Sequence, residues 1–251
     1  MTLVLLVRHG LTAATGTVLT GRMPGIPLDD RGREQARVLG ARLAGVHLDA
    51  IVTSTLERCR ETAAVIAAAR DGNQVAVQED ERFAEVGYGD WTGQPLKRLA
   101  KEPLWRVVQA HPSAVRFPGQ GGESLAGVQE RAVAAIREWN SRLGPKAAYL
   151  VCSHGDVIKS IIADSLGMHL DMFQRIQVDP CSLSVVRYTP VRPFVLRMND
   201  TGATLSSRKA ETGQAGAGAG KPGAGQAGAG QGTQLGRRGE DDAVVGGGAG
   251  G

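Results

Sequence analysis

The sequence predicts an α/β fold with a mostly parallel central sheet flanked by helices, and three observations support this. Apolar runs, typical of strands buried on both faces of a sheet, occur at residues 3–7, at 147–152 and, interrupted by Asp49, at 48–52. Each run is followed by a segment with the apolar spacing of a surface helix. The chain of 251 residues is 42% hydrophobic, which is enough for a sizeable core. Strands that alternate with helices in this way are typical of α/β proteins.

In the N-terminal half, helix signals follow the strand signals closely. Apolar side chains at Ala36, Leu39 and Leu43 are separated by charged residues, as on a surface helix. Asp29 and Asp30 precede them and are candidate caps. The elements predicted for this half are a strand at 3–7, a helix at 31–43, a strand at 48–52, a helix ending near residue 69 and a short strand at 74–78.

The C-terminal half begins with a loop rich in glycine, acids and aromatics, a composition that often lines functional sites. Ser124 is the predicted N-cap of a long helix. The predicted elements are the loop at 82–93, helices at 97–110 and 125–143, a strand at 147–152, a helix at 156–166 and strands at 182–188 and 194–198. The last two strands are expected to complete the sheet.

Charge and cysteine content exclude several classes of protein. The net charge is +4 and the isoelectric point about 9.2, but lysines and arginines are scattered among acids and aromatic residues make up 4% of the chain. The three cysteines, an odd number without metal-ligand spacing, favour free thiols in a reducing compartment. The apolar runs are too short for a membrane span or a signal peptide. We therefore expect a cytoplasmic protein that binds neither nucleic acid nor membranes.

The last part of the chain, residues 206–251, is predicted to be a disordered tail. It holds 16 of the 35 glycines, many of them in Gln-Ala-Gly runs, and few apolar side chains. Ordering such a glycine-rich backbone loses much conformational entropy, and little burial would compensate for it. The folded part is therefore expected to span residues 1–205.

Cationic and imidazole side chains follow three of the predicted strands. Arg8 and His9 follow the first, Arg58 the second and His154 the third. In open α/β sheets, ligands bind beyond the carboxyl ends of the strands, where helix N-termini also point. Two imidazoles and two guanidinium groups that meet there would form a pocket suited to a phosphoryl group.

These residues belong to a set of motifs that occur in a fixed order. The motifs are Arg8-His9-Gly10, Ser54 to Arg58, Glu85, the Gly-Tyr-Gly-Asp-Trp-Thr-Gly stretch at 87–93, Gly122-Glu123-Ser124 and Ser153-His154-Gly155. In this order they resemble the histidine phosphatases of the phosphoglycerate-mutase-like superfamily, over roughly residues 3–200. The resemblance implies a three-layer sandwich, with a histidine phosphatase domain at 1–205.

The resemblance also implies a mechanism. His9 would attack phosphorus and become phosphorylated, while Arg8, Arg58 and His154 hold the phosphoryl oxygens. Glu85 would protonate the leaving alcohol and then take a proton from the attacking water. The further substrate-binding residues that it implies are Gly10, Thr15, Thr20, Gly21 and Gly155. The expected partner is a small phosphorylated metabolite, and neither a metal nor a cofactor is expected.

Two positions depart from the family pattern in ways that bear on function. Thr15 occupies a position where the family often has asparagine, so a hydrogen bond to the substrate is either weakened or supplied by the hydroxyl group. Asp156 occupies a position where glycolytic mutases usually carry asparagine, whereas an acid or glycine resembles the phosphatase branch. A carboxylate there would disfavour a second phosphate.

Some residue roles stay open at this level. Arg60 competes with Arg58 for the second arginine, although the Ser-x-Leu-x-Arg spacing favours Arg58. The aromatic side chains Tyr88, Trp91 and Trp105 either line the mouth of the site or belong to the core.

The sequence is less consistent with three alternative functions. A metal site built from His9, His154, Glu85 and Asp156 is disfavoured because two arginines would repel the cation. A mutase must keep the phosphohistidine dry, and the span of about 30 residues from 93 to 124 lacks the long insertion typical of mutases, which favours hydrolysis. A non-catalytic phosphate-binding module has no support, since every catalytic position is filled. The substrate and the oligomeric state stay open.

Overall fold

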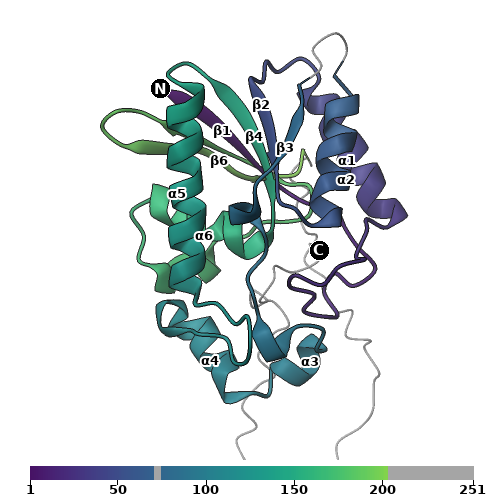
Figure 1. Cartoon of the computed structure of the whole chain (residues 1–251), viewed down its shortest axis with the longest axis vertical. Helices are drawn as coiled ribbons and strands as arrows, with labels where there is room; N and C mark the ends of the chain where they lie inside the picture. Colours follow the sequence, from purple (N-terminus) through teal and green to yellow (C-terminus); the bar gives the residue numbers. More distant parts are fainter. Residues whose placement is uncertain (71–74, 203–251) are drawn as a thin grey trace, which may run out of the picture. The chain divides into compact units, whose positions relative to one another are not determined.

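The computed structural model describes residues 1–70 and 75–202, which form a six-stranded sheet with helices on both faces (Figure 1). The strands are β1 (Thr2–Arg8), β2 (Ala50–Thr53), β3 (Val77–Glu79), β4 (Ala148–Ser153), β5 (Leu183–Tyr188) and β6 (Pro193–Asp200). The helices are α1 (Asp30–Leu43), α2 (Glu57–Ala68), α3 (Leu96–Leu99), α4 (Pro103–Ala110), α5 (Leu125–Leu143) and α6 (Gly155–Ser165). Short 3-10 turns in the loops are η1 (Glu81–Phe83), η2 (Gly89–Trp91), η3 (Pro112–Ala114) and η4 (Leu170–Arg175).

The strand directions bring the functional strand ends to one edge of the sheet. The order is β3-β2-β4-β1-β5-β6, and the first four strands are parallel. β5 is antiparallel to β1 and to β6. Arg8 at the end of β1 pairs with Ser153 at the end of β4, so the residues that follow these strands start side by side. The prediction of a mostly parallel sheet flanked by helices is confirmed.

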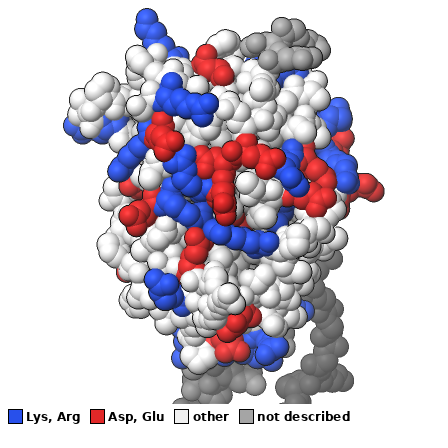
Figure 2. All heavy atoms as spheres, in the orientation of Figure 1, with Lys and Arg blue, Asp and Glu red and all other residues white. Residues whose placement is uncertain are grey.

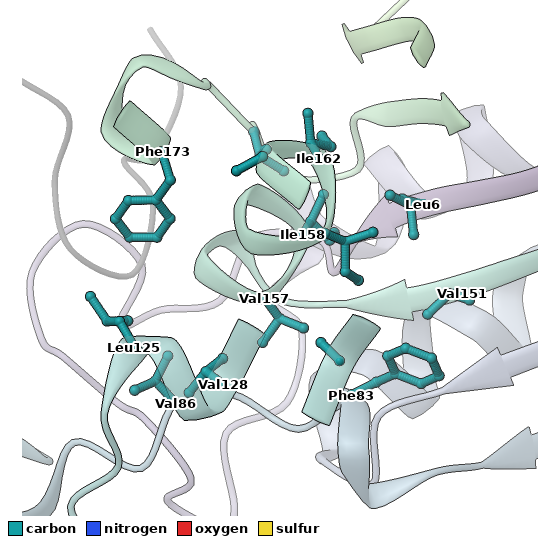
Figure 3. Close-up of a cluster of buried hydrophobic side chains, with 14 of the residues drawn as sticks. Leu6, Phe83, Val86, Leu125, Val128, Val151, Val157, Ile158, Ile162 and Phe173 are labelled. Carbon is teal, nitrogen blue, oxygen red and sulfur yellow. The ribbon is translucent and has the colours of Figure 1, made fainter. Parts of the chain in front are cut away.

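Strand β1 shows why both faces of the sheet are covered. Val4 and Leu6 belong to a core shared with α5 and α6, whereas Leu5 and Val7 belong to a second core shared with α1 and α2. Figure 3 shows part of the first core, where side chains of α5, α6 and the sheet point toward one another. Burial of one such side chain stabilises the fold by about 1.5–3 kcal/mol.

The predicted caps of two helices are present. The side chain of Asp29 accepts a hydrogen bond from Gly32 N at 2.7 Å, and that of Ser124 accepts one from Gly127 N at 3.1 Å. Each satisfies a backbone N–H that the first turn of a helix leaves without an intrahelical partner.

The single helix predicted at 97–110 is wrong, because the segment contains two helices. α3 ends at Leu99, and α4 begins at Pro103. Proline disfavours helical backbone in the residue before it, and Glu102 is extended (φ −72°, ψ 141°). The two short helices lie beyond the carboxyl ends of the parallel strands (Figure 1).

Other predictions are shifted or fall outside the described residues. The strand expected at 74–78 is β3, Val77–Glu79, and residue 74 is not among the described residues. The tail predicted at 206–251 lies outside them as well.

In the described ranges, none of the helices has the length and apolar character needed to cross a membrane. On the face shown in Figure 2, basic and acidic side chains are interspersed.

Candidate active site

A cavity lies at the carboxyl edge of the sheet, and most of the predicted site residues line it. His9 follows β1, Arg58 is in the first turn of α2, and Glu85 follows the turn η1. The side chains and backbone that line the cavity come from Arg8, His9, Thr12, Thr15, Gly16, Val18, Leu19, Thr20, Gly21, Arg58, Glu85, Tyr88 and Leu96. His154 does not line it but lies directly behind Arg58, at the N-cap of α6.

The hydrogen bonds of His9 fix its tautomer. Its Nδ1 lies 2.7 Å from the carbonyl oxygen of Gly10, which can only accept, so Nδ1 carries the proton. Nε2 therefore has a lone pair, and it accepts a hydrogen bond from Arg58 Nε at 3.3 Å. Burial, together with the positive charges of Arg58 and Arg8, lowers the pKa of His9 well below its ordinary value. The ring is neutral at neutral pH, and its Nε2 can act as a nucleophile.

The two arginines are anchored by backbone carbonyl groups. Arg8 Nη1 donates to Val178 O at 2.8 Å, and Arg58 Nη2 donates to Gly21 O at 2.8 Å. Both side chains are at most 2% exposed. Two buried guanidinium groups that line a cavity together with a neutral imidazole make the cavity suitable for an anion.

His154 is held in the opposite tautomer from that of His9. Its Nδ1 lies 3.2 Å from Arg58 Nη2, which can only donate, so Nδ1 is the acceptor. The proton is then on Nε2, which donates to Ser54 Oγ at 2.8 Å. The ring is fully buried 5.2 Å from the His9 ring, and burial, together with nearby Arg58, lowers its pKa well below the ordinary value.

Glu85 is a carboxyl group that can hold a proton near neutral pH. It is 4% exposed, and its Oε1 accepts a hydrogen bond from Val86 N at 3.0 Å. Burial and the negative charge of Asp156 raise its pKa to about 7, against the opposing effect of Arg58. Its Oε2 lies 3.9 Å from His154 Nδ1. A carboxyl group with this pKa can both donate and accept protons at neutral pH.

A second group of buried polar residues lies behind Glu85. Tyr88, which lines the cavity, donates from its hydroxyl group to Asp156 Oδ2 at 2.8 Å. Lys159 Nζ is 3.9 Å from Asp156 Oδ1 and donates to Gln174 at 3.1 Å. The sequence was consistent with a position of Tyr88 either at the mouth of the site or in the core. Its ring belongs to the core, and its hydroxyl group binds Asp156.

The predicted glycines have different positions relative to the cavity. Gly21 lines it with a left-handed backbone (φ 50°), whereas Gly10 and Gly155 do not line it. A Cβ atom on Gly10 would lie 2.6 Å from the carbonyl oxygen of Gly32, so glycine is required there for close packing of two backbone segments. A role of Gly10 and Gly155 in substrate binding stays a prediction.

The threonines at the mouth of the cavity contact each other. Thr15 and Thr20 both line it, as does Thr12, which the sequence did not single out. The Thr12 and Thr15 hydroxyl groups are 2.9 Å apart, and Thr15 Oγ1 accepts from Thr12 N at 3.0 Å. Thr15, at the position where the family often has asparagine, therefore stabilises the loop at residues 12–15 and also lines the cavity.

Backbone hydrogen bonds join this loop to the segment that leads into α3. Leu19 N donates to Gln94 O at 3.0 Å, and Leu96 N donates to Thr17 O at 3.0 Å. Val18 and Leu96 thereby become part of the lining. Sequence reasoning missed them because the two segments are far apart in the chain and the contact uses backbone atoms.

Arg60, Trp91 and Trp105, the other candidates for the site, do not line the cavity. Arg60 is exposed and pairs with Glu79 at 3.8 Å. Trp91 is buried and stacks on Trp105, with ring centroids 6.1 Å apart, outside the cavity lining.

All three cysteines are buried and reduced. Cys59 Sγ lies 3.4 Å from His154 Nε2, and Cys181 N donates to the carbonyl oxygen of Arg8 at 3.1 Å. Burial raises the pKa of Cys152 well above its ordinary value and that of Cys181 to about 12. The thiols of Cys152 and Cys181 are therefore neutral groups and not reactive thiolates.

Anion-binding side chains, a nucleophilic imidazole and a proton-donating carboxyl group are what transfer of a phosphoryl group requires. The fold and the site thus define an α/β enzyme that acts on phosphoryl groups. Residues 4–201 match the family model of the histidine phosphatase superfamily (branch 1). The chain belongs to this superfamily, and hydrolase activity follows from its membership among the phosphatases of the family.

The relatives include phosphatases and mutases. The chain is 32% identical to phosphoserine phosphatase 1 of Hydrogenobacter thermophilus, over 80% of this chain and 93% of the relative. It is 31% identical to the adenosylcobalamin/alpha-ribazole phosphatase of Escherichia coli, over 69% of this chain and 84% of the relative. Proteins named as phosphoglycerate mutases also match, at 27% to 31% identity.

A solved structure shows the same fold. The phosphoserine phosphatase of Entamoeba histolytica, in complex with 3-phosphoglyceric acid, is 25% identical and superposes with a TM-score of 0.70. The match covers 80% of this chain and 98% of that protein.

Proposed function

We propose that this protein is a metal-independent phosphatase that hydrolyses a small phosphomonoester through a phosphohistidine on His9. The observation that carries the proposal is the neutral His9 ring, whose Nε2 accepts a hydrogen bond from Arg58 in a cavity that Arg8 and Glu85 also line. We further propose that the enzyme acts in the cytoplasm on a small phosphorylated metabolite, without a cofactor.

The proposed reaction has two steps. In the first, the Nε2 lone pair of His9 attacks phosphorus, the bond from phosphorus to the leaving oxygen breaks, and Glu85 gives its proton to that oxygen. The guanidinium groups of Arg8 and Arg58 stabilise charge on the phosphoryl oxygens. In the second step water attacks phosphorus, Glu85 accepts a proton from the water and the P–N bond breaks. Inorganic phosphate leaves, and His9 and Glu85 return to their initial states.

The charges that line the cavity favour a phosphatase over a bisphosphate-primed mutase. Such a mutase must bind a second anionic group besides the transferred phosphoryl group. Among the described residues that line the cavity, the cations are Arg8 and Arg58, both beside His9. The rest of the lining, including Thr20 and Leu96, is uncharged apart from Glu85. This composition suits a monoester with an uncharged or hydroxyl-bearing leaving group.

The first experiment measures phosphate release from a panel of metabolites in the presence of EDTA. The panel holds sugar phosphates, 3-phosphoglycerate, phosphoserine, alpha-ribazole phosphate and a phosphohistidine peptide. We expect release from a few of these compounds, unchanged by EDTA and inhibited by vanadate, which mimics the pentacoordinate phosphoryl group. In parallel, 3-phosphoglycerate isomerisation is assayed with 2,3-bisphosphoglycerate as primer. Loss of activity in EDTA with recovery on added metal would contradict the mechanism, and fast isomerisation with little release would make the enzyme a mutase.

The pH dependence of the first step should be set by Glu85. Because its pKa is about 7, the carboxyl group holds its proton below that pH and loses it above, so kcat/KM for an ester with a poor leaving group should fall as the pH rises through 7. Asp156→Asn removes the negative charge that helps to raise this pKa, and the fall should then begin at lower pH by on the order of one unit. Both profiles are measured with phenyl phosphate, so that ionisation of the substrate is the same in each. Coincident profiles would remove Asp156 from this role.

A further inference from the structure

Two arginines outside the cavity bind the main chain of Glu85, and one carboxylate joins them. Arg22 Nε donates to the carbonyl oxygen of Glu85 at 2.7 Å, and Arg131 Nη2 donates to the same oxygen at 3.2 Å. Both guanidinium groups also bind Glu123 Oε2, at 2.9 Å for Arg22 and 3.0 Å for Arg131. We call these three residues the Arg22–Glu123–Arg131 network.

The network joins parts of the chain that are distant in sequence. Arg22 is in the loop after β1, Glu123 precedes the N-cap of α5, and Arg131 lies within that helix. Glu123 also binds the segment that carries Glu85, because Gly87 N donates to Glu123 Oε2 at 2.8 Å and Glu123 N donates to Gly87 O at 2.8 Å. The main chain on both sides of Val86 is therefore fixed by one carboxylate and its two arginines.

The network is built as a unit and not as a loose surface ion pair. Arg131 binds Glu123 through both carboxylate oxygens and also donates to Arg82 O at 2.6 Å. The side chains of Arg131 and Glu123 are 18% and 27% exposed. Burial alone would raise the pKa of Glu123, but hydrogen bonds from Arg131 and Gly87 hold it below its ordinary value. A bidentate pair with several shared donors has a defined geometry, unlike most exposed pairs.

None of the three residues lines the cavity, so they do not reach the substrate from where they lie. Their contact with the reaction is through Glu85, whose carboxyl group extends from the main chain that they hold. A proton donor must lie within hydrogen-bond reach of the leaving oxygen, and a misplacement of about 1 Å costs on the order of 10²-fold in rate.

We propose that Arg22, Glu123 and Arg131 are positioning residues that set the place of the Glu85 carboxyl group for proton transfer to the leaving group. The inference rests on the function proposed above. It predicts a selective effect, since loss of the network should slow only those reactions that need the proton of Glu85, whereas a residue that merely supports the fold would affect all substrates alike.

The test compares two substrates of similar shape, phenyl phosphate and p-nitrophenyl phosphate. Nitrophenolate is a good leaving group that needs little protonation, and phenolate is a poor one. Glu123→Gln keeps the size of the side chain but places an amide NH2 group against the guanidinium donors. We expect kcat/KM to fall by about 10- to 100-fold for phenyl phosphate and by less than about threefold for p-nitrophenyl phosphate.

A double-mutant cycle shows whether the effect passes through Glu85. In a Glu85→Gln background, Glu123→Gln should change turnover of phenyl phosphate by no more than about twofold, because the group it positions is already absent. Arg131→Lys keeps the charge but has one ammonium group in place of the fork, so it should give the same selective loss. Arg137→Met is the matched control, since Arg137 is an exposed arginine of the same helix, paired with Asp164 at 3.7 Å, and its loss should leave both substrates unaffected.

The outcomes separate this inference from the function on which it rests. Equal losses on both substrates in Glu123→Gln and Arg131→Lys, with thermal unfolding unchanged, would overturn the positioning role. Fully additive losses in the double mutant would overturn it as well. If instead Glu85→Gln itself shows no preference between the substrates, the proposed proton transfer fails, and the positioning role fails with it.

Discussion

Replacement of His9 by alanine is expected to lower turnover by roughly 10⁴-fold or more and to abolish the phosphoenzyme. His9 lines the cavity together with Arg8 and Arg58, and its Nε2 carries the lone pair of the neutral ring. The neighbouring imidazole of His154 cannot substitute for it, because this ring does not line the cavity and its Nε2 donates its proton to Ser54. Steady-state phosphate release and labelling of the protein under alkaline quench, where phosphohistidine is stable, measure the two effects.

A second histidine provides the control for this experiment. His47 is exposed and pairs with Asp49 at 3.2 Å, away from the cavity lining. His47→Ala should retain full turnover and full labelling. Label that persists in His9→Ala at the level of the parent protein would place the nucleophile on another residue.

Glu85→Gln is expected to show the second largest effect, a loss of about 10²- to 10⁴-fold on phenyl phosphate. The amide cannot donate the proton that a poor leaving group needs, although its size and its hydrogen bond from Val86 N are retained. On p-nitrophenyl phosphate the loss should be much smaller. The ratio of kcat/KM for the two substrates, before and after the substitution, is the measurement.

Glu81, four residues before Glu85 in the sequence, is the matched control for it. It lies in the same acidic stretch of the sequence but is exposed on the turn η1. Glu81→Gln should leave both substrates unchanged. A selective loss in Glu81→Gln, or an equal loss on both substrates in Glu85→Gln, would assign the proton donor to a different group.

The position of the site at the carboxyl ends of the strands was predictable from sequence. The apolar runs at 3–7 and 147–152 are followed within two residues by a cationic or imidazole side chain, Arg8 or His154. In a parallel sheet such ends meet at one edge, so chain order alone brings these side chains together. The caps at Asp29 and Ser124 were predictable for a similar reason, since capping depends on contacts a few residues away.

What could not be predicted depends on contacts between distant segments. Arg22 and Glu123 are 101 residues apart, and nothing in their local sequence indicates that Arg22 binds both Glu123 and the carbonyl oxygen of Glu85. The Gly-Glu-Ser motif marked Glu123 as notable but gave it no role. The break between α3 and α4 differs, because it has a local cause in Pro103. The prediction of one helix followed the helical spacing of the neighbouring residues and did not take this proline into account.

The buried thiols near the site are relevant to the sensitivity of this enzyme to oxidation. Phosphatases that use a cysteine need a thiolate, and the same thiolate is what peroxide attacks. Here nitrogen is the proposed nucleophile, and the sulfur atoms of Cys152 and Cys181 lie in surroundings that keep them protonated. With nitrogen as the nucleophile, the bond-forming atom is not a thiolate that peroxide could oxidise, in contrast to the reacting atom of a thiol-based phosphatase.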